Sequence, residues 1–180
     1  MKRDAQSAMR AMIDASSAIL LAKAGAIESC CRMFRLQMTR RVFEEVTVPG
    51  HMGAERLKTL AGKRPGIAVV ADPAGHLPDR AAVDLRGLHR GERDSLHHCL
   101  MGAARFVIID DGQAVRVCRR HGIAHVNALL CPKLLLFSGR ITGQRAHFLF
   151  ARIAALGRYS EDVRRWAESC GPTDLEAFLR

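Results

Sequence analysis

The chain has 180 residues, of which 48% are hydrophobic, and its formal net charge is +10. This length suits one domain whose core can fold without disulfide bonds or a structural metal. The longest apolar stretch, 123–137, is broken by polar residues and is too short to span a bilayer, and no apolar signal segment precedes it. We therefore expect a cytoplasmic protein without membrane contact. Its positive net charge favours binding to polyanions, of which nucleic acid is the most common. The alternative is that the charge serves only solubility.

Apolar runs alternate with amphipathic segments in the first half of the chain. Residues 1–11 are polar and are expected to be an N-terminal extension, so the core should begin near Met12. The run 12–13 predicts a strand that ends at Asp14, after which Ser16 and Ser17 offer N-caps for a helix that stops near Gly25. The pattern then predicts a helix over 27–34, a strand over 36–38, a helix over 40–46, an exposed helix over 52–61 and a buried strand over 67–71.

The second half continues this alternation after a segment, 72–90, whose Pro, Gly and charged residues predict mostly loop. The predicted elements are a helix over 92–103, the strongest strand at 106–109, a helix over 113–121, a strand over 123–126 and helices over 128–137, 142–156 and 160–169. Strands that alternate with helices predict an α/β fold with a central parallel sheet. We expect a core over 12–141, with extra C-terminal helices over 142–180 packed on it.

Carboxylates follow two of the predicted strands. Asp14 and Asp110 each come directly after an apolar strand run, and ligands of open α/β sheets bind at the carboxyl ends of the strands. Each Asp could instead cap the helix that follows it. Two such residues, with further acids at helix starts, favour a functional site over capping. Asp111 could cap the helix after Asp110, so either residue could complete the site.

Helix geometry separates the other acids. Glu92 shares the helix face of Leu96 and is expected to point inward, whereas Asp94 should point to solvent. In the helix over 40–46, Glu45 lies at the margin of the apolar stripe and Glu44 lies nearly opposite. Glu92 and Glu45 are therefore the better site candidates.

Several carboxylates that converge in one cleft repel one another, and a divalent cation removes that conflict. Oxygen ligands alone favour Mg²⁺ or Mn²⁺ over zinc, and such an ion can activate water for attack on a phosphate. Six cysteines are present without a Cys-x-x-Cys pair, so reduced, buried thiols are expected. Cys118, His121 and His125 lack a second ligand pair, which argues against a zinc site.

Four motifs in this order resemble the PIN-domain family over about 12–141. They are the opening strand with Asp14 and Ser16, the segment Val42-Phe43-Glu44-Glu45-Val46, the helix start Gly91-Glu92, and the strand that leads into Asp110-Asp111-Gly112. The resemblance implies a three-layer α/β/α sandwich and cleavage of single-stranded RNA with Mg²⁺ or Mn²⁺. It also implies catalytic roles for Asp14, Glu45, Glu92 and Asp110, of which Asp14, Glu92 and Asp110 would hold the metal, supported by Ser16 and Asp111.

Many small bacterial members of this family are toxins of the VapC type, which a short antitoxin protein holds inactive, so an antitoxin is an expected partner. A non-catalytic PIN-like module that binds RNA or protein is the alternative.

The chain departs from the family pattern at His97, His98 and Cys99 and in its C-terminal helices. There, the stripe Phe148, Ala151 and Ala155 is expected to pack on the core, with a homodimer face as the alternative, and Tyr159 and Trp166 are expected to pack between helices, with base stacking as the alternative.

Overall fold

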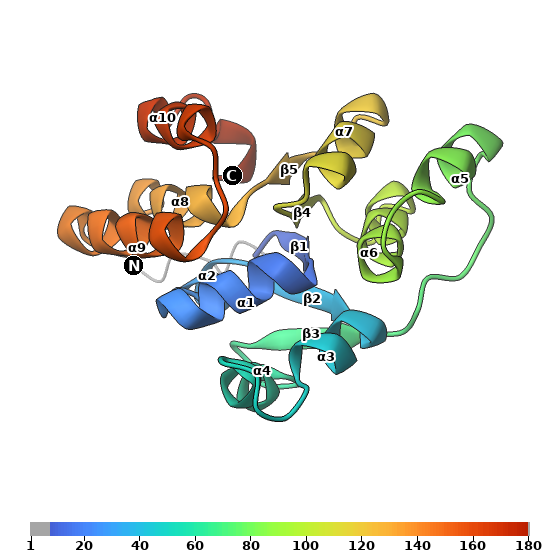
Figure 1. Ribbon diagram of the computed structural model, residues 1–180, viewed down its shortest axis with the longest axis horizontal. Helices are drawn as coiled ribbons and strands as arrows, with labels where there is room; N and C mark the ends of the chain where they lie inside the picture. Colours follow the sequence, from blue (N-terminus) through green and yellow to red (C-terminus); the bar gives the residue numbers. More distant parts are fainter. Residues whose placement is uncertain (1–7, 180) are drawn as a thin grey trace, which may run out of the picture.

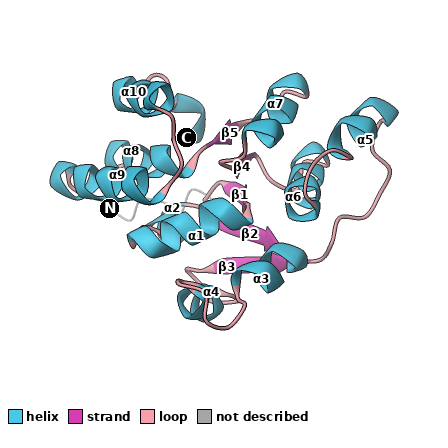
Figure 2. Cartoon of the chain, in the orientation of Figure 1, coloured by secondary structure: helices cyan, strands magenta, loops and turns pink. Residues whose placement is uncertain are grey.

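The computed structural model describes residues 8–179, which form a five-stranded parallel sheet with helices on both faces (Figure 1 and Figure 2). The strand order is β3-β2-β1-β4-β5. The strands are β1 (Arg10–Ile13), β2 (Arg35–Thr39), β3 (Ile67–Val70), β4 (Phe106–Ile108) and β5 (His125–Val126). The predicted α/β fold with a central parallel sheet is confirmed.

The helices follow the strands in the alternation that the sequence predicts. They are α1 (Ala15–Ala24), α2 (Ile27–Met33), α3 (Arg40–Val46), α4 (Ala54–Leu60), α5 (Asp79–Leu85), α6 (Arg90–Leu100), α7 (Gly112–Arg120), α8 (Cys131–Phe137), α9 (Gly143–Leu156) and α10 (Glu161–Ser169). Two short 3-10 helices, η1 (Ala128–Leu130) and η2 (Glu176–Phe178), complete the described chain. None of the helices between residues 8 and 179 combines the length and hydrophobicity that a bilayer crossing requires.

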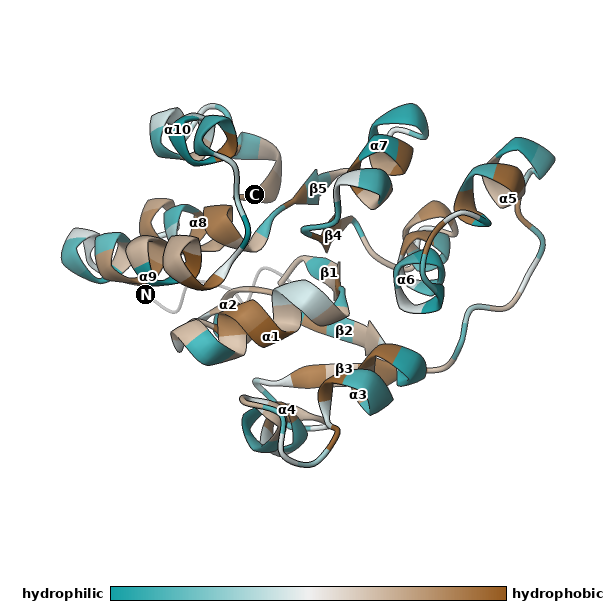
Figure 3. Ribbon diagram, viewed as in Figure 1, coloured by the Kyte–Doolittle hydropathy of each residue, from teal (hydrophilic) through white to brown (hydrophobic). Residues whose placement is uncertain are grey.

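Two separate cores lie on the two faces of the sheet. In β1, Ala11 and Ile13 face a core built with α1 to α4, α8 and α9, whereas Met12 faces a smaller core built with α5, α6 and α7. Phe106 and Val107 divide between these cores in the same way, as alternate residues of a strand must. The brown, hydrophobic stretches of α1 and α8 in Figure 3 belong to the larger core. The predicted three-layer sandwich is therefore confirmed.

Three predicted boundaries differ from the structure. β1 begins at Arg10 and Ala11 is fully buried, so the expected start of the core at Met12 falls inside a strand. Residues 1–7 of the proposed extension lie outside the described residues. The predicted loop over 72–90 contains α5, because Ala81 and Leu85, four residues apart, are buried against the smaller core despite their polar neighbours. Asp14, rather than Ser16 or Ser17, is the N-cap of α1.

The phase of α9 also differs from the prediction. Ala146, Leu149 and Ile153 are buried, whereas Phe148, Ala151 and Ala155 are exposed. Both apolar stripes have the same helical spacing, and packing of α9 against α1 and α8 selects the first. Trp166 is 54% exposed, so its expected packing between helices is wrong. All six cysteines are free, and five of them are buried.

Candidate active site

The carboxyl ends of β1 and β4 bring two predicted acids together. The strands are parallel neighbours in which Ile13 is opposite Ile108, and the Asp14 amide donates to the Ile108 carbonyl at 3.1 Å. Asp14 and Asp110 therefore emerge at the same edge of the sheet. Ser17 contacts both, because its amide donates to Asp14 Oδ1 at 2.9 Å and its hydroxyl donates to Asp110 Oδ2 at 2.5 Å.

Asp14 caps α1 and is also one of the two acids of this pair. Only 2% of the residue is exposed, and its Oδ1 caps α1 by accepting the Ser17 amide, while the Ser16 hydroxyl donates to its Oδ2 at 2.6 Å. Burial and the charge of Asp110 raise the pKa of Asp14 from 3.8 to about 7, although hydrogen bonds from Ser16 and Ser17 oppose the shift. An N-cap alone does not require a second carboxylate beside it.

Asp110 is held by three different elements. Besides Ser17, the Tyr159 hydroxyl donates to Oδ1 at 2.5 Å and the Ala128 amide donates to the same oxygen at 3.2 Å. Burial raises the pKa of Asp110, whereas these hydrogen bonds lower it. Burial and the neighbouring charge of Asp110 raise the pKa of Tyr159, which keeps its hydroxyl protonated as a donor. Tyr159 lies in the loop between α9 and α10 and packs against the larger core.

Sequence reasoning missed Ser17 and Tyr159 as site residues. Ser17 directly follows a residue that the family motif singles out, so its position in the first turn of α1 was a usable signal. Tyr159 is 49 residues from Asp110 in the chain and belongs to no motif. Only the packing of the C-terminal elements brings Tyr159 to the acid.

A second group of acids lies at the starts of α6 and α7. Glu92 is half-buried, and its Oε2 accepts the His89 amide at 3.2 Å, as in a capping box. Asp111 caps α7, because its Oδ1 accepts the amides of Gln113 and Ala114, both at 2.8 Å. Burial, then the charges of Asp111 and of the exposed Glu45, raise the pKa of Glu92. The charges of these acids therefore influence one another, and Glu92 and Asp111 each also accept backbone amides at the start of a helix.

Gly91 allows this second group to form. A Cβ atom at this position would lie 3.0 Å from Val42 Cγ2 and 3.8 Å from Glu45 Oε2. That contact is tighter than side chains normally make, so the absence of a side chain lets α6 approach α3 closely. The Gly-Glu pair at the start of α6 thus sets Glu92 beside Glu45.

The predicted acids divide between these two groups instead of forming one cluster. Asp14 and Asp110 lie together with Ser16, whereas Glu45, Glu92 and Asp111 form the outer group. Among residues 8–179, no three His, Cys, Asp or Glu side chains are gathered closely enough to hold a metal ion. Asp110 is thus the partner of Asp14, and Asp111 is the neighbour of Glu92.

The expected solvent exposure of Asp94 is wrong. Its side chain is only 9% exposed and pairs with Arg41 Nε at 3.2 Å and with Arg93 Nε at 3.4 Å. The reason is that α6 packs against β1, β2 and β4 and also against α3 and α7, so more than one side of the helix is covered. A single inward face, assumed from helix periodicity, does not describe such a helix.

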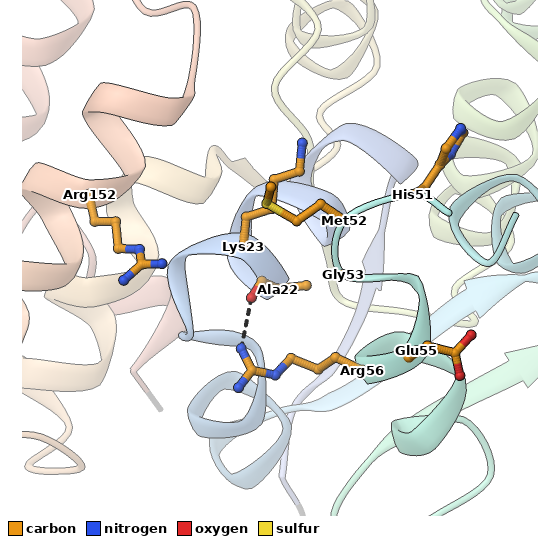
Figure 4. A pocket seen from close by; sticks show the side chains of 8 residues that line it. All are labelled: Ala22, Lys23, His51, Met52, Gly53, Glu55, Arg56 and Arg152. Atoms are coloured by element: carbon orange, nitrogen blue, oxygen red, sulfur yellow. Dashed lines mark hydrogen bonds between the residues drawn. The ribbon is translucent and has the colours of Figure 1, made fainter. Parts of the chain in front are cut away.

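Of the hollows on the surface of the described residues, one adjoins the acid pair. It has a volume of about 600 Å³ and is lined by Asp110 and Tyr159 together with residues of α7, β5 and α10. Another, of about 380 Å³, lies among α1, α4 and α9 and is lined by residues that include Lys23, Arg56 and Arg152 (Figure 4). No acid of either group lines this second hollow, so we place the candidate chemistry at the first.

The comparisons with known proteins agree with this architecture. A family model that describes a PIN domain matches residues 10–161, well over half of the chain. No curated protein and no solved structure matches the chain. The match begins where β1 begins and extends past Asp110 and Tyr159 to the start of α10. With its parallel five-stranded sheet and the acids at its carboxyl edge, the chain belongs to the PIN-domain family, whose fold is of the nuclease type.

Proposed function

We propose that this protein is a divalent-metal-dependent ribonuclease that hydrolyses phosphodiester bonds of single-stranded RNA at the edge formed by β1 and β4. The observation that carries the proposal is the pair formed by the buried Asp14 and the half-buried Asp110, which share Ser17 as a hydrogen-bond donor. Burial of like charges side by side is costly unless the charges are used. Carboxyl groups with strongly shifted pKa values beside a hollow are a common feature of catalytic sites.

The donor atoms of this site suit a hard cation. Asp14 and Asp110 offer carboxylate oxygens in a place where burial and then the charge of Asp110 raise the pKa of Asp14, and a divalent ion would relieve the repulsion between the two acids. Each carboxylate oxygen of Asp14 accepts one hydrogen bond and so keeps a further lone pair for a ligand. Asp14 and Asp110 would hold Mg²⁺ or Mn²⁺, with Glu92 as the next candidate. Such an ion supplies activation of water and stabilisation of charge on a phosphate.

The chain's own residues supply the positioning. Ser16 and Ser17 orient the carboxylate of Asp14, whereas Ser17 and Tyr159 orient that of Asp110. Such hydrogen-bond partners are normally required for full metal affinity. The net charge of +10 supports a polyanionic substrate, since arginine and lysine contacts to phosphates supply most non-specific affinity for nucleic acids.

The assignment to RNA and the toxin role rest on the resemblance to VapC-type proteins. We propose that a short antitoxin protein neutralises this nuclease. Expression of the chain alone should then stop growth of a bacterial host, and a small protein should co-purify from the native source. Harmless expression of an active nuclease that purifies alone would remove the toxin role and leave the enzymatic one.

One observation favours a second candidate, a PIN-like module that binds RNA without cutting it. Every oxygen of Asp14 and Asp110 already accepts a hydrogen bond, and the acids form two groups rather than one. Incubation of purified protein with single-stranded RNA and Mn²⁺ or Mg²⁺, with and without EDTA, separates the candidates. We expect cleavage that EDTA abolishes. RNA that stays intact with every metal but is retained by the protein would support the binding module.

A further inference from the structure

The hollow beside Asp110 has the size and walls of a small-molecule site. Its volume of about 600 Å³ falls within the roughly 300–1,000 Å³ of typical ligand pockets. Val126 of β5 and Val163 of α10 give it an apolar lining. Trp166 completes that lining and is 54% exposed, so the fold leaves a large aromatic ring available to a flat apolar ligand.

The rim of the same hollow is cationic. Arg119 of α7 and Arg158 line it, and neither forms an ion pair with a carboxylate in the part of the chain that the structure describes. Asp162, an acid that also lines the hollow, forms an ion pair with Arg165, with 2.7 Å between Oδ1 and Nη2. An apolar aromatic wall can stack on the base of a nucleotide, and two arginines without acidic partners can bind its phosphate.

The wall that carries Trp166 is held in place from behind. Lys133 of α8 donates to the carbonyls of Glu168 and Cys170, at the end of α10, and Arg164 donates to the Ala154 carbonyl at 3.0 Å. Most of α10 follows residue 161, where the family match ends. This wall is therefore a feature of the present chain beyond the matched region.

We propose that this hollow is a nucleotide subsite that takes one residue of single-stranded RNA, with the base against Trp166 and the phosphate between Arg119 and Arg158. Tyr159 lines the hollow and donates to Asp110, so a nucleotide seated there lies directly beside the acid pair. The subsite deepens the proposed ribonuclease function and rests on it for the identity of the polymer. The subsite would position the RNA, and the acid pair would carry out the hydrolysis of its phosphodiester bond.

Binding can be measured without cleavage because Trp166 is the single tryptophan of the chain. In EDTA, a single-stranded RNA hexamer should quench its fluorescence saturably. Adenosine monophosphate should do the same at higher concentration, because it offers one base and one phosphate. Inorganic phosphate, which has no base to stack, should leave the fluorescence unchanged. Absence of quenching by hexamer and mononucleotide, or quenching only by a co-purifying protein, would overturn the proposal.

Variants then test each wall by anisotropy of a labelled hexamer. Trp166→Ala should weaken binding by about 5- to 150-fold, the range for loss of one stacked base, and Trp166→Phe should restore most of the affinity. Arg119→Ala and Arg158→Ala should each weaken binding and reduce the salt dependence by about one counterion. The matched control is Arg152→Ala, which removes the same charge from the hollow among α1, α4 and α9 (Figure 4) and should change affinity by less than about twofold.

The outcomes separate the subsite from the nuclease. Wild-type affinity in Trp166→Ala, or an equal loss in Arg152→Ala and Arg119→Ala, would overturn the subsite, even if cleavage is metal-dependent. Conversely, persistence of cleavage in EDTA would overturn the metal mechanism while the binding results stand. Because Trp166 is exposed, its replacement should leave the melting temperature nearly unchanged, which verifies that the variant is folded.

Discussion

The inner acid pair, Asp14 and Asp110, and the outer group, with Glu92 and Asp111, use the same chemical group in different surroundings. The inner pair lies at strand ends, where Asp14 is buried and Asp110 is half-buried, and burial raises the pKa of both carboxyl groups because their charges are poorly screened there. Glu92 and Asp111 lie at helix starts, where backbone amides and partial exposure to water stabilise their charges. The difference indicates that the inner pair carries the larger unrelieved cost, so a bound cation should affect it most.

The largest effect should come from neutralising the inner pair. Asp14→Asn or Asp110→Asn should lower the rate of RNA cleavage by about a thousandfold or more, because loss of a charged group at the reaction centre exceeds the 10- to 100-fold typical of residues that only orient a ligand. Glu92→Gln should fall in that lower range. Single-turnover cleavage at saturating Mn²⁺ measures all three.

Glu44→Gln is the control for this series, because Glu44 is exposed and should leave the rate unchanged. If Glu92→Gln is as inactive as Asp14→Asn, the two acid groups act as one centre when metal is bound, and the division drawn from the structure fails. Thermal melts of each variant show whether a loss of rate reflects unfolding.

The second effect is on stability against pH. Asp14 is protonated in the folded chain up to about pH 7 but ionises near 3.8 when unfolded, so the unfolded state binds fewer protons between these values. Its stabilising contribution is fully present below pH 3.8 and is lost as pH rises towards about 7. At about 1.4 kcal/mol for each pH unit, the loss approaches roughly 4 kcal/mol. Metal-free Asp14→Asn protein should therefore match or exceed wild type in stability at pH 7.

Urea unfolding of both proteins across this pH range measures the effect. Their difference removes the opposite contribution of Asp84, whose pKa is lowered by a hydrogen bond from His121 in both proteins. Mn²⁺ at a hundred times its Kd should stabilise wild type by about 2.7 kcal/mol and the variant much less. A destabilised variant, with no response of wild type to Mn²⁺, would show that Asp14 serves only as the cap of α1.

A smaller effect is expected from Tyr159→Phe, which removes the hydroxyl that donates to Asp110 and keeps the ring. Loss of an orienting hydrogen bond should raise the Mn²⁺ concentration for half-maximal cleavage by about 10- to 100-fold. The Mn²⁺ titration is the decisive readout, because a purely structural role would lower the melting temperature without moving that midpoint.

The smallest effect concerns Asp94, which contacts neither acid group by hydrogen bond and pairs instead with Arg41 and Arg93. Both arginine side chains are about two-fifths exposed, so Asp94→Asn should cost about 1 kcal/mol of stability and leave cleavage unchanged. Urea unfolding and a cleavage assay below the melting temperature check this. An inactive, folded variant would place Asp94 in the site and show that the helix face has been misassigned.

The sequence alone determined the sheet and half of the site. Hydrophobic runs before Asp14 and Asp110 predict strands, and parallel strands in one sheet share their carboxyl edge, so the meeting of these acids follows from local pattern and topology. A threonine directly before a predicted helix is a preferred N-cap, and in the structure the Thr39 hydroxyl accepts the Val42 amide at 3.2 Å.

Only the tertiary structure decided which helix faces are buried and which distant residues complete the site. The stripes of Ala146 and of Phe148 have equal spacing, and Asp94 is buried because several elements cover α6 at once. Tyr159 reaches Asp110 across 49 residues through the packing of the C-terminal helices. Periodicity describes one element at a time, whereas burial depends on every element that packs against it, and the contact between Tyr159 and Asp110 exists only in the folded chain.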